Sequence, residues 1–135
     1  MSCISCDESM SVNVLSLDAQ HRHLMQLLSE YEAALSSCAS QEKIYEILSR
    51  LLEYTYAHFS FEEKLLCYAC YPAARQHCCD HEILKNKIAE LLKEIEDGKE
   101  GKEIEILTLL VKWLNNHILK KDKAYSYHLA ENGIL

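Results

Sequence analysis

The chain of 135 residues contains only three glycines and one proline. This shortage of turn-forming residues argues against an all-β fold with many tight turns and favours long helices. No apolar run approaches the roughly 18 residues that a membrane span needs. Residues 1–10 contain neither the basic segment nor the apolar segment of a signal peptide. We therefore expect a helical, cytoplasmic protein that does not insert into a membrane.

Basic residues are also in deficit. The 14 lysines and arginines are outnumbered by 21 aspartates and glutamates, which gives a formal net charge of -7 at pH 7. Negative charge repels a phosphate backbone, so nucleic acid is not an expected partner. The apolar fraction of 49% is ordinary and is sufficient for a core in a chain of this length.

Apolar residues recur at steps of three and four in four stretches, a pattern typical of amphipathic helices. These seams begin at Leu17, Ile44, His77 and Leu107 and end near Leu35, Leu65, Ile95 and His117. Ser16 and Ser40 are the predicted N-caps of the first two helices. Pro72 is predicted in the first turn of the third helix, where a missing N–H is tolerated.

Short connections between these stretches predict an all-α fold, an up-down-up-down four-helix bundle. We expect a single domain over residues 1–135. Its parts are an N-terminal arm over residues 1–15, the bundle over residues 16–122, and a short C-terminal helix or tail over residues 123–135. After Lys120 the pattern predicts no more than a short helical turn.

Six seam positions carry polar residues where a plain core would be apolar. They are His21, His58, Glu62, His77, His81 and His117. Any one of them alone is best explained as a hydrogen-bonded core residue. Together they occur early in the odd-numbered helices and late in the even-numbered ones, which is the same end of an antiparallel bundle. Asp122, five residues after His117, is close enough along the chain to join this layer.

Imidazoles and carboxylates gathered in one buried layer form a metal-ligand set. Seven ligands exceed the needs of one ion, so we predict two ions that share the carboxylates. A mononuclear zinc hydrolase is the alternative, but it leaves three or four ligands unexplained. The set is richer in histidine than the di-iron oxygenase pattern and contains no Glu-x-x-His pair. This composition favours binding dioxygen over cleaving it.

Four segments carry a resemblance to a known family. They are LDAQHRHL (17–24), HFSFEEKLL (58–66), YPAARQHCCDH (71–81) and WLNNHILKKD (113–122). The chain resembles hemerythrin over nearly its whole length, most closely the single-domain bacterial members. The resemblance implies two non-haem iron ions with an oxo or hydroxo bridge, and dioxygen as their ligand. It assigns His77, His81 and His117 to one iron, His21 and His58 to the other, and Glu62 and Asp122 to both.

The resemblance also implies an apolar pocket for dioxygen. Its lining is Leu24, Phe59, Trp113, Leu114 and Ile118, and each of these is explained equally well as a core residue. One departure from the family is Cys6, which stands where a tryptophan is usual and removes a large apolar wall near the pocket.

Seven cysteines are a high count for a chain without an export signal. Six of them stand in close pairs, namely Cys3 with Cys6, Cys67 with Cys70, and Cys78 with Cys79. In a reducing compartment such thiols are free, metal-bound or redox-active. Ordinary small thiols are the favoured interpretation, with a redox or disulfide switch as the first alternative and extra metal binding as the second.

The sequence and the resemblance together predict a non-enzymatic protein for oxygen transport, storage or delivery. An oxygen-consuming protein is the expected partner, and the expected state is a monomer or a weak homo-oligomer. Two alternatives remain open at this point. One is a sensor of oxygen or redox state that uses the metal site and the cysteines. The other is an oxidase, a peroxidase or a nitric-oxide-handling enzyme.

Overall fold

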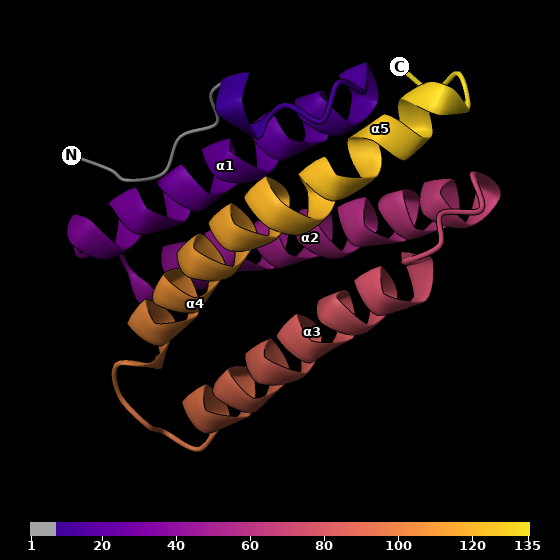
Figure 1. Ribbon diagram of the computed structural model, residues 1–135. Helices are drawn as coiled ribbons and strands as arrows, with labels where there is room; N and C mark the ends of the chain where they lie inside the picture. Colours follow the sequence, from indigo (N-terminus) through magenta and orange to yellow (C-terminus); the bar gives the residue numbers. More distant parts are fainter. Residues whose placement is uncertain (1–7) are drawn as a thin grey trace.

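The structure, a computed structural model, describes residues 8–135. Every regular element within this range is a helix (Figure 1). The four long helices are α1 (Leu15–Ser36), α2 (Gln41–Tyr68), α3 (Ala74–Glu96) and α4 (Lys102–His117). They lie side by side and successive helices run antiparallel, which confirms the predicted four-helix bundle. A 3-10 turn, η1 (Glu8–Met10), precedes α1. No helix within residues 8–135 has both the length and the apolar character needed to cross a membrane.

The two predicted N-caps have different outcomes. Ser40 caps α2 as predicted, because its side-chain oxygen accepts a backbone N–H of the first turn at 3.2 Å. Ser16 does not cap α1, since that helix already begins at Leu15. The acidic residue of its first turn, Asp18, instead accepts the backbone N–H of Val12 at 2.8 Å. Asp18 therefore fastens the preceding segment to the start of the helix.

Pro72 also lies slightly outside its predicted position. The third helix begins at Ala74 with Ala73 as its N-cap, so Pro72 precedes the first turn. The backbone N–H of Ala74 donates to the carbonyl of Tyr71 at 3.0 Å, which closes a turn with Pro72 at its second position. The fixed φ angle of proline suits that position of a β-turn.

The apolar interior consists of two clusters with a polar layer between them. The larger cluster draws on all four long helices and includes Leu24, Leu28, Leu51, Phe59, Leu84, Ile88, Leu110 and Leu114. The smaller one comprises Val12, Val14, Leu17, Leu66, Ala69, Tyr125 and Leu129. On α1, His21 lies between Leu17 of the smaller cluster and Leu24 of the larger one, and Glu62 has the same position on α2. The predicted metal ligands therefore separate two apolar regions.

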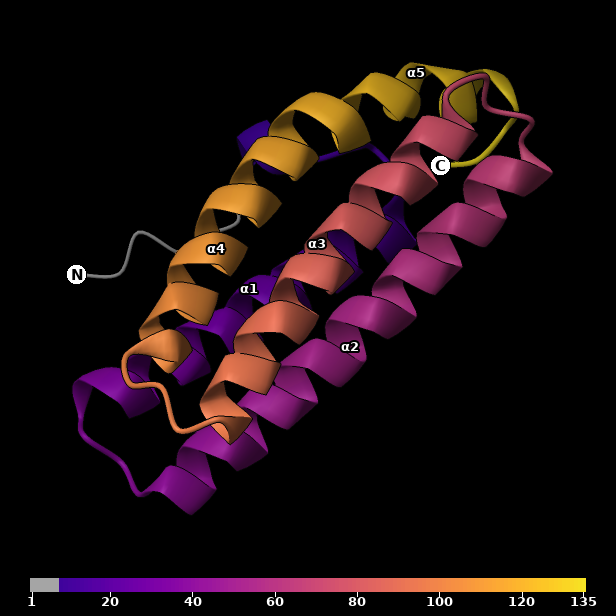
Figure 2. The same ribbon diagram turned by 90° about the horizontal axis from the view of Figure 1, so that it is seen from below.

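The helix that contains His117 does not end as early as the sequence predicts. A π-helical turn, η2 (Ile118–Asp122), continues α4 directly into a further helix, α5 (Lys123–Glu131), and the three form one rod along the bundle (Figure 2). In a regular α-helix, residues five apart are about 140° apart around the axis. The wider π turn brings Asp122 beneath His117, with His117 Nε2 3.1 Å from Asp122 Oδ1.

Candidate metal centre

Seven side chains meet in the polar layer, and each residue is at most 6% exposed. They are His21, His58, Glu62, His77, His81, His117 and Asp122, the seven residues singled out from the sequence. The Nε2 atom of every histidine lies within 3.8 Å of a carboxylate oxygen of this set. The α1, α2, α3, α4 and η2 segments all contribute, so the layer is assembled by the bundle as a whole.

The two oxygens of Glu62 face different histidines. Oε1 lies 2.5 Å from His77 Nε2 and 3.2 Å from His81 Nε2. Oε2 lies 3.4 Å from His58 Nε2 and 3.8 Å from His21 Nε2. Each oxygen of the Glu62 carboxylate therefore faces its own pair of imidazoles.

Asp122 repeats this division. Its Oδ1 lies 3.0 Å from His77 Nε2 and 3.1 Å from His117 Nε2, and its Oδ2 lies 3.2 Å from His21 Nε2. Each carboxylate thus presents one oxygen to a three-histidine set and the other oxygen to a two-histidine set. This is the arrangement that two cations with shared carboxylate ligands require.

A second ring of hydrogen bonds orients the inner side chains. Gln20 Oε1 accepts from His58 Nδ1 at 2.6 Å, and Glu63 Oε2 accepts from His81 Nδ1 at 2.7 Å. The Tyr125 hydroxyl donates to Glu62 Oε2 at 2.9 Å. Bonds at Nδ1 leave the Nε2 atoms free to face a metal ion. The sequence reasoning missed these three residues, although Gln20 and Glu63 each adjoin a predicted ligand in the chain.

Several buried polar atoms of the layer make no hydrogen bond within the described part of the chain. They are both ring nitrogens of His21, Nε2 of His81 and Oδ1 of Asp122. A buried polar atom without a partner is costly, so a centre with several of them is explained by a ligand. Imidazole and carboxylate groups suit iron or zinc, and the residues present therefore fit a pair of metal ions.

Electrostatics in the layer favour anionic carboxylates. Burial by itself lowers the pKa of His21 and of His77. The nearby carboxylates of Asp122 and Glu62 outweigh it and raise the pKa of both imidazoles to about 9. Burial raises the pKa of the two carboxyl groups, but their close contacts with the histidines outweigh it and hold both well below their usual range. Without metal the layer retains protons on histidine that an incoming cation must displace.

Aromatic rings cover the outer faces of two of the histidines. Phe59 stacks on His81 with ring centroids 3.8 Å apart, and Trp113 stacks on His117 at 4.2 Å. The three other residues predicted to line a dioxygen pocket are Leu24, Leu114 and Ile118, and they are buried in the larger apolar cluster. Of the five predicted lining residues, Phe59 and Trp113 are thus the ones whose rings stack on histidines of the polar layer.

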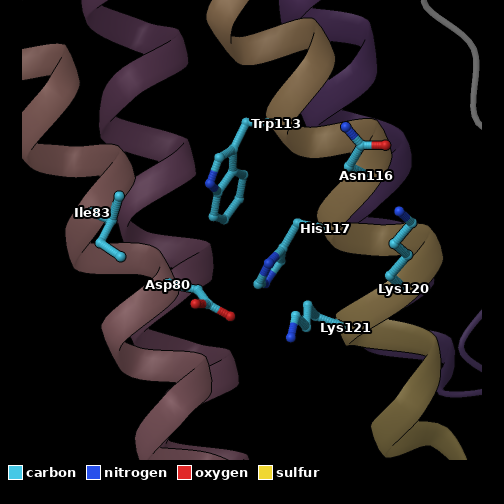
Figure 3. A pocket seen from close by; sticks show the side chains of 7 residues that line it. All are labelled: Asp80, Ile83, Trp113, Asn116, His117, Lys120 and Lys121. Carbon is cyan, nitrogen blue, oxygen red and sulfur yellow. The ribbon is translucent and has the colours of Figure 1, made fainter.

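A pocket of about 260 Å³ opens between α3 and α4 beside this layer (Figure 3). Trp113 and His117 form part of its wall, and Ile83 and Asp80 face them from α3. Asn116, Lys120 and Lys121 complete the lining. His117 is consequently a member of the polar layer that borders a surface pocket.

The described cysteines lie outside the polar layer. Cys38, Cys67, Cys70 and Cys79 are exposed and Cys78 is half-buried, and all five are free thiols. Burial and the neighbouring carboxylate of Glu63 raise the pKa of the Cys78 thiol, which reduces its reactive thiolate fraction. The predicted pair Cys3 and Cys6 lies outside the described residues. A redox role for these thiols stays a prediction.

Fold and site together define a class of protein, a four-helix bundle with a buried histidine–carboxylate centre for two metal ions. The sequence profile of the Hemerythrin HHE cation binding domain matches residues 13–127. The chain therefore belongs to the hemerythrin family.

Similar proteins cover most of the chain. A bacteriohemerythrin of Stenotrophomonas maltophilia is 29% identical over 126 residues, which are 93% of this chain and 81% of that protein. One of Clostridium acetobutylicum is 29% identical over 122 residues, 87% of this chain and 95% of that protein. One of Pseudomonas aeruginosa is 28% identical over 118 residues, 87% and 76% of the two chains.

Proposed function

We propose that this protein binds dioxygen reversibly at two non-haem iron ions and serves in oxygen transport, storage or delivery without catalysing a reaction. The observation that carries the proposal is the division of the Glu62 and Asp122 oxygens between two histidine sets. His77, His81 and His117 would hold one iron, His21 and His58 the other, and the two carboxylates both. Membership of the hemerythrin family supports dioxygen as the ligand.

The two sets differ in the number of histidines. The set of His21 and His58 offers one protein ligand fewer than the other set, so a vacant coordination position for a small ligand is expected on that side. Iron, when bound, supplies the electrons that allow dioxygen to bind reversibly. The low carboxylate content of the centre is the reason that we propose binding and not cleavage.

The protein's own contribution is a dry and rigid surrounding. Apolar clusters lie on both sides of the polar layer, and they keep bulk water from the buried carboxylates. Phe59 and Trp113 cover the faces of two imidazoles. Hydrogen bonds from His58, His81 and Tyr125 hold ligand side chains in fixed orientations, which limits rearrangement when a ligand enters or leaves.

The first test is iron content together with visible absorption spectra. We expect two irons per chain, and absorption bands that disappear on gentle deoxygenation and return in air. His58→Ala should abolish the change, whereas His23→Ala, at an exposed position of α1, should not. Bands that never return, or turnover of an added reductant, would favour the sensor or oxidase alternatives. Absence of iron would refute the proposal.

A further inference from the structure

The two metal positions differ in the charge of the groups that hold their histidines. His58, in the two-histidine set, donates its Nδ1–H to the neutral side-chain amide of Gln20 at 2.6 Å. His81, in the three-histidine set, donates to the carboxylate of Glu63 at 2.7 Å. Both hydrogen bonds are short, and each joins α2 to a neighbouring helix. Their geometry is therefore similar, but one acceptor is neutral and the other is charged.

Charge at Nδ1 changes the donor strength of the same ring at Nε2. A carboxylate that accepts the Nδ1 proton draws it away from the ring and leaves Nε2 more electron-rich, and an amide does so much less. Nε2 of His81 lies 3.2 Å from Glu62 Oε1, inside the polar layer. The negative charge of Glu63 is thus transmitted to the metal-facing atom through a single imidazole.

The surroundings leave this carboxylate free to act. The Glu63 side chain is 26% exposed and pairs with His81, and its other neighbour is the uncharged thiol of Cys78. The imidazole between the carboxylate and the layer cannot turn away, because Phe59 stacks on its face with an interplanar angle of 6°. On the other side, the Gln20 amide holds a ring that packs edge-on against His21 with centroids 4.8 Å apart.

We infer that Glu63 and Gln20 are positioning residues that make the two metal positions unequal. Glu63 strengthens the three-histidine position and favours the more highly charged state of its ion, and Gln20 leaves the two-histidine position weaker and easier to reduce. The inference rests on the two-ion centre of the proposed function, but it does not depend on dioxygen.

The test exchanges the two charges. Glu63→Gln keeps the size and the acceptor oxygen but removes the charge, Gln20→Glu does the reverse, and the double variant swaps them. Glu82→Gln, at an exposed carboxylate of α3, is the matched control. Cobalt(II) is titrated anaerobically into the metal-free proteins, and the two binding steps are followed by absorption and by competition with a chelator.

We expect Glu63→Gln to weaken the tighter step about 10- to 100-fold, and Gln20→Glu to strengthen the weaker step. With iron, Glu63→Gln should raise the reduction potential of the more easily oxidised ion. Thermal unfolding of each metal-free variant shows whether its fold is retained. The inference is overturned if Glu63→Gln matches Glu82→Gln within about threefold while remaining folded. Two binding steps with the expected cobalt shifts, together with an iron-loaded protein that does not bind dioxygen, would refute the proposed function and leave this inference standing.

Discussion

Tyr125 offers a direct test of how far the polar layer depends on residues outside the ligand set. This tyrosine lies on α5, is fully buried, and donates its hydroxyl to Glu62 Oε2 at 2.9 Å. Burial and the negative charge of Asp122 and Glu62 raise its pKa well above the ordinary value, so the hydroxyl keeps its proton. Tyr125→Phe removes this one hydrogen bond and preserves the ring that packs against Tyr71 and His77.

The expected loss follows from the chemistry of the acceptor. A hydrogen bond to a charged group contributes about 1.5–3 kcal/mol. Glu62 keeps its histidine contacts in the variant, so the loss should fall near the lower end, about 1.5 kcal/mol in the free energy of unfolding. Urea unfolding of the metal-free protein at pH 7 measures it.

The same helix contains the control. Tyr127 is 72% exposed, and its hydroxyl bonds to the surface carboxylate of Glu131. Tyr127→Phe should change the free energy of unfolding by less than about 0.5 kcal/mol, as surface substitutions usually do. If both variants lose the same amount, or if Tyr125→Phe loses less than about 0.5 kcal/mol, the hydroxyl does not support Glu62 and the reasoning is wrong.

Three further outcomes follow from the structure. His117→Ala removes one member of the three-histidine set, so bound iron should fall below two per chain and Tm should drop by roughly 5 °C or more, whereas the exposed His23→Ala should preserve both. Cys38 is exposed and has a φ of 54°, so Cys38→Gly should raise the free energy of unfolding by about 0.5–1 kcal/mol in chemical denaturation. The pKa of His21 and of His77 is raised to about 9 in the metal-free fold, above the ordinary 6.5. Their contribution to stability is therefore complete below pH 6.5 and is lost as pH rises through 9. Melting of the metal-free protein at pH 6 and pH 10 should show this loss, and the metal-loaded protein should not show it.

The long-range arrangement of the bundle was accessible from the sequence because helical periodicity is strong here. Histidines early in one helix and late in the next fall in one layer whenever neighbouring helices are antiparallel and their connections are short. That argument needs only the seam and the breaks near residues 37–40, 72 and 98–101. It therefore anticipated which seven side chains the bundle brings together, although it could not specify how their oxygens and nitrogens face one another.

Local geometry was less accessible. Residues five apart, such as His117 and Asp122, do not lie on the same face of a regular α-helix. Nothing in the sequence predicts the π turn that brings their side chains together. The same turn carries the chain onward into α5 and so places Tyr125 beside Glu62, a contact that the seams do not predict. Side chains outside the seams, such as Gln20 and Glu63, give no periodic signal at all.

The division of the interior also bears on how metal binding and folding are related. The larger apolar cluster draws on all four long helices without using a metal ligand, so the bundle has a hydrophobic core that does not need the ions. The polar layer is different, because its buried carboxylates need positive charge close by. In the metal-free fold, protons on His21 and His77 supply that charge, and in the proposed loaded fold two cations would replace them. Metal ions and protons therefore compete for a layer that the surrounding helices have already assembled, unlike small zinc domains, in which the metal supplies the folding energy itself.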